Sequence, residues 1–284
     1  LENYMKYATI KVGQMENNYG NAHFSRNDNE SGITKPFKGN YLMDGFATEI
    51  GAELYYSRNN FLFMGGLSNG KLNQDVTNPE ATTAAIIGKF GYDKQMNENL
   101  RFRLTGSIYH SSKLKSVYLY SGDRTGSRFY NVIQATGENA DFRAGRVNPG
   151  FKNKLTAMMF NNFIKYNNFE LFTTYETSTG GDKTGSSETR TWNQFAIDAL
   201  YRFGNNDNFY FAGKYNNVSG KLLNTDAKKV SVNRIEAGFG WYLTKNVMSK
   251  FLYVNQDYND YAPTSKYDGA NFKGFAFEAI RSFY

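Results

Sequence analysis

The sequence contains no cysteine, only four prolines and no stretch of about eighteen apolar residues. Without cysteine the chain forms neither disulfides nor thiolate metal sites, and a metal centre would depend on carboxylates and two histidines. The lack of a long apolar run excludes a transmembrane helix. A basic start followed by an apolar stretch is also absent, so we expect that a secretory signal was removed or that further sequence precedes residue 1.

The residues that are abundant point to a membrane-spanning sheet. Aromatic residues make up 17% of the chain and glycine occurs 27 times, yet the mean hydropathy is -0.62. A sheet with one aromatic face and one polar, water-facing face combines these features, as a transmembrane barrel does. Scarce proline agrees, because proline cannot donate a hydrogen bond within a sheet.

The charge balance is basic but evenly spread. Lysine and arginine number 33 against 26 aspartates and glutamates, which gives a net charge of +7. A nucleic-acid groove would gather its cations in one region. These cations lie along the whole chain among acidic residues, so we expect no nucleic-acid partner.

Period-two alternation predicts strands. Residues 100–109 place Leu100, Phe102 and Leu104 on one face and Arg101 and Arg103 on the other. In a barrel the first set would meet lipid and the second the lumen. The same pattern predicts twelve strands, at 4–15, 46–57, 60–68, 82–92, 99–112, 152–165, 169–178, 190–203, 208–218, 229–242, 247–257 and 272–284.

The connections between these strands alternate in length. Short, Asn-rich turns occur near residues 57–60, 166–168, 204–207 and 244–246, and long polar segments separate them. Short periplasmic turns and long extracellular loops are typical of outer-membrane barrels. We therefore predict an all-β, antiparallel up-and-down transmembrane barrel, one domain over residues 1–284, in the outer membrane with both termini periplasmic. The aromatic-ended strand 274–284 resembles the terminal strand by which the barrel-assembly machinery recognises its clients.

Three patches carry a resemblance to a known family. They are Lys11-Val12-Gly13-Gln14 with Tyr19-Gly20, the segment 21–29, and the hairpin 238–254 that contains Gly238-Phe239-Gly240-Trp241. Together they resemble the phosphate-selective porins O and P and their Bacteroidetes-type relatives. Members of that family usually have about sixteen strands, with strands before the Val-Gly-Gln element. The resemblance therefore implies that the twelve strands are the C-terminal part of a larger barrel, or that this is a smaller relative.

The lumen-facing parity selects candidate pore-lining residues. The cations on that parity are Lys11, Lys89, Arg101, Arg103, Arg202, Lys214, Arg234 and Lys250. Seven carboxylates share it: Glu49, Glu53, Glu170, Glu176, Asp198, Glu236 and Glu278. Arg101 and Arg103 with Lys89 could form an anion-attracting wall, whereas cross-strand pairing with nearby carboxylates is the interpretation we favour.

Two further expectations concern loops and aromatic residues. The longest loop, 113–151, either folds inward as a constriction or, as we expect, caps the extracellular surface. Five aromatic residues near strand ends are expected to face the membrane interface: Tyr56, Tyr92, Trp192, Phe203 and Trp241.

The sequence thus predicts a porin for passive diffusion of small hydrophilic solutes, including anions such as phosphate. A non-conducting scaffold barrel is the alternative, and an outer-membrane phospholipase using His110, Ser111 or Ser112 is a minor one. We expect no catalytic residue, metal or cofactor. The expected partners are membrane lipid, lipopolysaccharide and the permeating solute, with a homotrimer or association with other outer-membrane proteins left open.

Overall fold

The computed structural model describes residues 5–21, 36–37, 40–69, 83–114, 117–121, 132–143, 145–182, 187–223 and 229–283. It contains one antiparallel sheet in which each strand pairs with the next along the chain. The strands are β1 (Ala8–Glu16), β2 (Thr48–Arg58), β3 (Phe61–Ser68), β4 (Ala85–Gln95), β5 (Leu100–Leu114), β6 (Lys152–Tyr166), β7 (Phe169–Gly181), β8 (Thr189–Phe203), β9 (Phe209–Gly220), β10 (Val230–Thr244), β11 (Val247–Asn259) and β12 (Asn271–Arg281).

The predicted fold is confirmed strand by strand. All twelve predicted strands are present, and the largest error is at β1, which begins at Ala8 rather than at residue 4. Short and long connections alternate as predicted. Asparagine occurs in the short turns because it adopts positive φ more readily than most residues. Asn59 and Asn60, between β2 and β3, have φ of 51° and 68°, and a type I′ hairpin needs positive φ at both positions.

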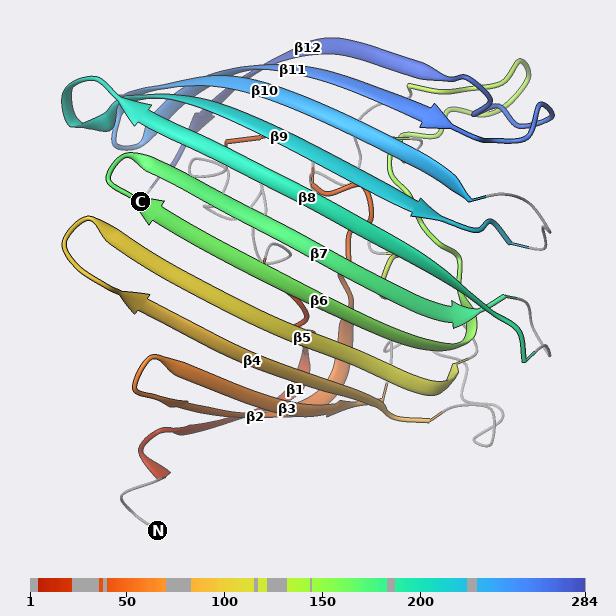
Figure 1. Cartoon of the computed structure of the whole chain (residues 1–284), viewed down its shortest axis with the longest axis horizontal. Coiled ribbons are helices and arrows are strands. Elements are labelled where there is room, and N and C mark those ends of the chain that lie inside the picture. Colours follow the sequence, from red (N-terminus) through yellow and green to blue (C-terminus); the bar gives the residue numbers. More distant parts are fainter. Residues whose placement is uncertain are drawn as a thin grey trace.

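The sheet is a curved wall that does not close (Figure 1). Among the described residues, β1 pairs with β2 and β12 pairs with β11, while β1 and β12 do not pair with each other. Chain segments from the long connections, including the orange segment that precedes β2, lie on the inner side of the curve (Figure 1). No helix in the described ranges is long and apolar enough to cross a membrane.

The two faces of the wall differ in polarity, as the alternation predicts. The outer face exposes large apolar side chains at alternate positions, among them Leu54, Phe90, Ile108, Phe160, Phe195, Tyr201, Phe211, Ile235, Phe251 and Phe277. The inner face buries polar and charged ones, including Glu49, Glu53, Lys89, Thr105, Asn161, Glu176, Gln194, Lys214, Arg234 and Lys250. Such an inside-out arrangement suits a sheet with lipid outside and water inside.

On the inner face, large aromatic rings lie over glycines of the neighbouring strand. A Cβ on Gly220 of β9 would come 2.2 Å from Trp192 of β8, and one on Gly240 would come 2.0 Å from Tyr210. Glycine is therefore required at these positions because the ring occupies the space of a side chain.

Candidate functional site

All eight predicted pore-lining cations lie on the inner face, but their burial differs. Lys89, Lys214, Arg234 and Lys250 are buried, whereas the other four, Lys11, Arg101, Arg103 and Arg202, are partly or largely exposed. The structure thus places all eight on the face that buries polar side chains. That they line an open pore stays a prediction.

Five of these cations, Arg101, Arg202, Lys214, Arg234 and Lys250, lie within ion-pair distance of a carboxylate, which for all but Arg234 is on a neighbouring strand. Lys250 of β11 lies directly opposite Glu278 of β12, with 2.9 Å between Nζ and Oε2. Glu236 of β10 lies between Lys214 and Arg234, at 3.6 Å and 3.7 Å. In a poorly solvated interior such pairing offsets the cost of removing each charge from water.

The proposed arginine wall on β5 is also paired. Arg101 donates two hydrogen bonds to Asp93 of β4, of 2.8 Å and 2.7 Å. The guanidinium of Arg103 lies 5.1 Å from the ring centre of Phe163, and Arg202 contacts Glu170 at 3.4 Å. The cross-strand pairing interpretation is therefore correct for Arg101, and the wall is not a ladder of unopposed arginines.

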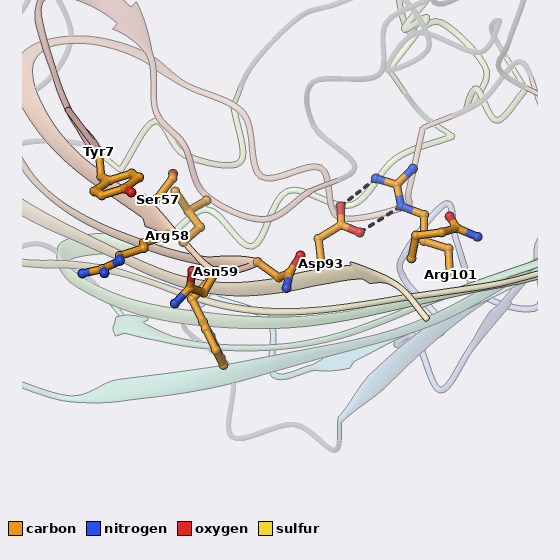
Figure 2. Close-up of a pocket in the computed structure, with 10 residues that line it drawn as sticks. Tyr7, Ser57, Arg58, Asn59, Asp93 and Arg101 are labelled. Atoms are coloured by element: carbon orange, nitrogen blue, oxygen red, sulfur yellow. Dashed lines mark hydrogen bonds and ion pairs between the residues drawn. The ribbon is translucent and has the colours of Figure 1, made fainter. Parts of the chain in front are cut away.

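A cavity of about 630 Å³ lies at the turn end of β2–β5 (Figure 2). Figure 2 shows the bidentate pair of Asp93 and Arg101 on one side and Tyr7 beside Arg58 on the other. The guanidinium carbon of Arg58 is 5.2 Å from the Tyr7 ring centre. The cavity is an open depression beside the β2–β3 turn and the turn ends of β4 and β5.

Residues 17–21 and 40–47 of the β1–β2 connection form what we name the first infolded segment. Lys89 donates to the Asn18 side-chain oxygen at 2.6 Å and to the Gly20 carbonyl at 2.8 Å. The backbone N–H of Asn18 donates to Glu53, and that of Gly20 donates to Ser107. This part of the segment therefore crosses the wall from β2 to β5.

The second half of the first infolded segment continues along β8–β10. Gln194 both accepts from the backbone N–H of Met43, at 3.0 Å, and donates to its carbonyl, at 2.7 Å. The N–H of Leu42 donates to Asn216 at 2.6 Å. Because polar side chains of the wall satisfy its backbone groups, the segment can lie inside without a sheet of its own.

Residues 117–121 and 145–151 of the β5–β6 connection form the second infolded segment. It packs on the first: the N–H of Phe46 donates to the Leu119 carbonyl at 2.7 Å, and the N–H of Val147 donates to the Leu42 carbonyl at 2.8 Å. These parts of loop 113–151 fold inward, so the expectation that the loop only caps the surface is corrected. The inward folding of the β1–β2 connection was not predicted.

Glu176 of β7 joins both infolded segments to the wall. Its Oε1 accepts hydrogen bonds from the hydroxyls of Tyr19, at 2.8 Å, and Tyr120, at 2.6 Å. Its Oε2 accepts from Gln194 at 3.1 Å. Burial and the neighbouring carboxylate raise the pKa of Tyr19 and of Tyr120, so both hydroxyls remain donors.

Arg234 is a second such junction. Its Nε donates to Gln256 of β11 at 2.7 Å, its Nη1 to the Asn40 carbonyl at 3.1 Å, and its Nη2 to the Gly145 carbonyl. One buried guanidinium thus holds β11 and both infolded segments together. The planar fork of arginine suits this task because its donors point in fixed directions.

One aromatic residue was placed on the wrong face. Trp192 is fully buried on the inner face, and its indole N–H donates to the Lys221 carbonyl at 2.8 Å. It therefore does not belong to a membrane girdle. Trp241 does lie outside, 44% exposed and stacked on Phe209.

The phospholipase alternative finds no support in the geometry. His110 contacts Thr156 on β6 at 2.8 Å, Ser111 is buried on the opposite face, and the Ser112 hydroxyl contacts that of Thr83 at 3.1 Å. A nucleophile and its base must lie within hydrogen-bond reach of each other. Within the described ranges no group of three or more histidines and carboxylates could hold a metal ion.

No family model and no curated protein matches the sequence. Among solved structures, outer-membrane expressed OmpT of Vibrio cholerae aligns with 97% of this chain and 77% of its own, with a TM-score of 0.55 and 12% identity. The trimer form of in-vitro folded OmpT covers the same shares at 0.53 and 12%. OccAB3 of Acinetobacter baumannii aligns with 84% of this chain and 57% of its own, at 0.49 and 11%. The likeness to the OmpT structures shows that the chain has the fold of outer-membrane β-barrel proteins.

These findings correct two expectations. The general resemblance to outer-membrane barrels is supported, but the phosphate-selective branch and its Bacteroidetes-type relatives are not. The expectation that the chain is not an enzyme was wrong as a conclusion, because the OmpT structures that align with it show its fold, and a fold does not exclude catalysis. At 12% identity the likeness shows the fold alone and identifies no catalytic residue here.

Proposed function

We propose that the chain forms a passive diffusion channel for small hydrophilic solutes in the outer membrane, as one barrel domain with periplasmic termini. One observation carries the proposal: a wall that is apolar outside and polar inside has two polar-anchored chain segments folded against its inner face. A chain segment that narrows the lumen of a wide barrel limits the size of the solutes that pass. The charges beside such a constriction favour the entry of ions of one sign.

The edges of the wall add a physical requirement. Unpaired N–H and C=O groups of β1 and β12 would each cost several kcal/mol in hydrocarbon (about 2–7 for an amide). We therefore propose that both edges are paired in the membrane, with each other or with further strands.

A preference for anions such as phosphate is the finer part of the proposal. The eight candidate lysines and arginines favour it, but Asp93, Glu170, Glu236 and Glu278 form ion pairs with five of them, Arg101, Arg202, Lys214, Arg234 and Lys250. Paired charges attract ions weakly because each dipole's field falls off faster than that of a lone charge. We expect a weak anion preference rather than a dedicated phosphate site.

The second candidate is a scaffold barrel that conducts nothing. It is favoured by the full burial of Tyr19, Leu42, Met43 and Tyr120 between the infolded segments and the wall. Such packing would block the lumen if the remaining space on the inner side were filled as well.

Swelling of liposomes that contain the purified, folded protein separates the two candidates. Vesicles loaded with an impermeant polymer are diluted into isosmotic arabinose, glucose, sucrose or raffinose, and light scattering follows the entry of each sugar. A diffusion channel gives swelling rates that fall steadily with solute size. Rates equal to those of protein-free vesicles for every sugar would refute the channel and favour the scaffold.

A further inference from the structure

A second cavity, of about 500 Å³, lies at the loop end of the wall, away from the depression of Figure 2. Its lining combines aromatic rings with charged side chains: Trp192, Tyr258, Tyr261 and Tyr267, with Asp141, Arg143 and Arg146. The volume lies in the range of small-molecule sites, about 300–1,000 Å³. We name this cavity the loop-end pocket.

The aromatic side of the loop-end pocket is a packed platform. Tyr258 and Tyr267 are stacked with ring centres 5.0 Å apart and planes 19° from parallel. Tyr261 lies against both, at 6.0 Å and 5.3 Å. Tyr258 is buried, whereas Tyr261 and Tyr267 are partly exposed, so the platform is fixed from below and presents ring surface to the pocket.

The polar side comes from the β5–β6 connection, which lies beside the β11–β12 connection (Figure 1). An ion pair of 2.8 Å between Glu138 and Lys266 joins the two connections. Asp141 fixes its own turn by accepting the backbone N–H of Arg143 at 2.9 Å. Two guanidiniums and one carboxylate thus share the lining of the pocket with the tyrosines.

This combination matches the chemistry of a sugar. The C–H face of a pyranose ring packs on an aromatic ring, while its hydroxyls need planar donors and acceptors such as guanidinium, carboxylate and amide groups. A lone phosphate would use only the polar side. The lining carries two guanidiniums and one carboxylate, a net positive charge that favours an acidic group on the sugar.

We propose that the loop-end pocket binds a pyranose unit of a carbohydrate and prefers sugars that carry a carboxylate. This binding site goes beyond the proposed diffusion channel and does not depend on conduction, since a scaffold barrel could present it equally well.

The chain offers a built-in reporter for this site. It has two tryptophans, of which Trp192 lines the loop-end pocket and Trp241 is exposed on the outer face. In a Trp241→Phe background the fluorescence of folded protein reports on the pocket alone. Titration with glucuronate and with glucose, up to about 10 mM, measures the affinity for each sugar. A printed glycan array probed with the labelled protein measures which glycans are bound.

We expect a saturable fluorescence change and capture of uronate-containing glycans, with glucuronate binding about tenfold tighter than glucose. Tyr267→Ala should weaken binding about three- to tenfold, and Arg146→Gln should remove the preference for the acidic sugar. Tyr166→Ala and Arg281→Gln, both at the turn end, are the matched controls and should bind as the parent does.

The proposal is overturned if the folded protein captures no glycan and its fluorescence does not change. It is also overturned if the change persists unaltered in Tyr267→Ala and Arg146→Gln. Equal affinity for glucuronate and glucose would remove the role given to the arginines. Circular dichroism of each variant confirms that the strands are formed, and because liposome swelling is measured separately, loss of sugar binding is distinguishable from loss of the channel.

Discussion

Arg234 holds both infolded segments against the wall, and its replacement by methionine should release them. The substitution keeps an unbranched, apolar side chain in the same space but removes the donors to Asn40, Gly145 and Gln256. It also removes one of the two cations beside Glu236. The variant therefore leaves two backbone carbonyls and part of a buried carboxylate charge without their partner.

The size of the effect follows from the burial of this group. Removing one partner of a buried ion pair costs about 3–5 kcal/mol, because the remaining charge stays desolvated. The strands keep their ladder hydrogen bonds, so the cost falls on the docking of the infolded segments. At about 1.4 kcal/mol per tenfold change, 3 kcal/mol shifts the ratio of docked to released segments by more than about a hundredfold.

Single-channel recording measures this release directly. Arg234→Met should give larger and noisier conductance steps than the parent, because the segments no longer narrow the bore. Lys250→Met is the matched control, since Lys250 is equally buried but its ion pair joins β11 to β12 within the wall. If Arg234→Met is folded and its step size and noise equal those of the parent, the infolded segments do not set the width of the channel.

Three further predictions address charge, packing and the lipid face. Arg101→Glu with Arg103→Glu should move the reversal potential toward cations, because the pair changes from positive to negative at the inner face. Gly220→Val should destabilise the folded barrel by about 1–3 kcal/mol, because its Cβ would overlap Trp192; urea unfolding in lipid vesicles measures this. Phe195→Arg, near the middle of the outer face of β8, should cost about 2–4 kcal/mol by the same assay.

Each of these predictions has a matched variant. Glutamine at both Arg101 and Arg103 should give half the shift in reversal potential, and an unchanged potential in the glutamate variant means that these residues do not face the conducting path. Gly213→Val should be tolerated, since nothing lies within 4 Å of its Cβ; equal loss in both glycine variants would contradict the packing argument. Phe195→Leu should fold like the parent, and an unaltered stability of Phe195→Arg would contradict a lipid-facing position.

Much of the wall was predictable because strand periodicity is local. The parity rule placed all eight cations on the inner face, with Lys250 and Glu278 on the same parity; the register of β11 and β12 then sets them opposite each other. The same rule predicts the inner face for Trp192, which shares the parity of Arg202 on β8. Its position near a strand end instead predicts an interfacial residue, and in the structure the parity prevails.

The infolded segments were beyond the reach of periodicity. Residues 17–21 and 40–47 have no regular alternation, and their backbone groups are satisfied by side chains far along the chain, such as Lys89 and Gln194. The carboxylate that pairs with Arg101 could not be named from the sequence for a simpler reason. Asp93 lies just past the predicted end of the strand at residue 92, whereas β4 extends to Gln95.

The central claim is that the polar inner face borders a water-filled path across the membrane. Recording the purified, folded parent protein in a planar bilayer under a salt gradient tests it most directly. The account predicts discrete conductance steps with a reversal potential that favours anions weakly. An absence of steps from protein that is demonstrably folded and inserted would contradict the claim and identify the molecule as a closed scaffold.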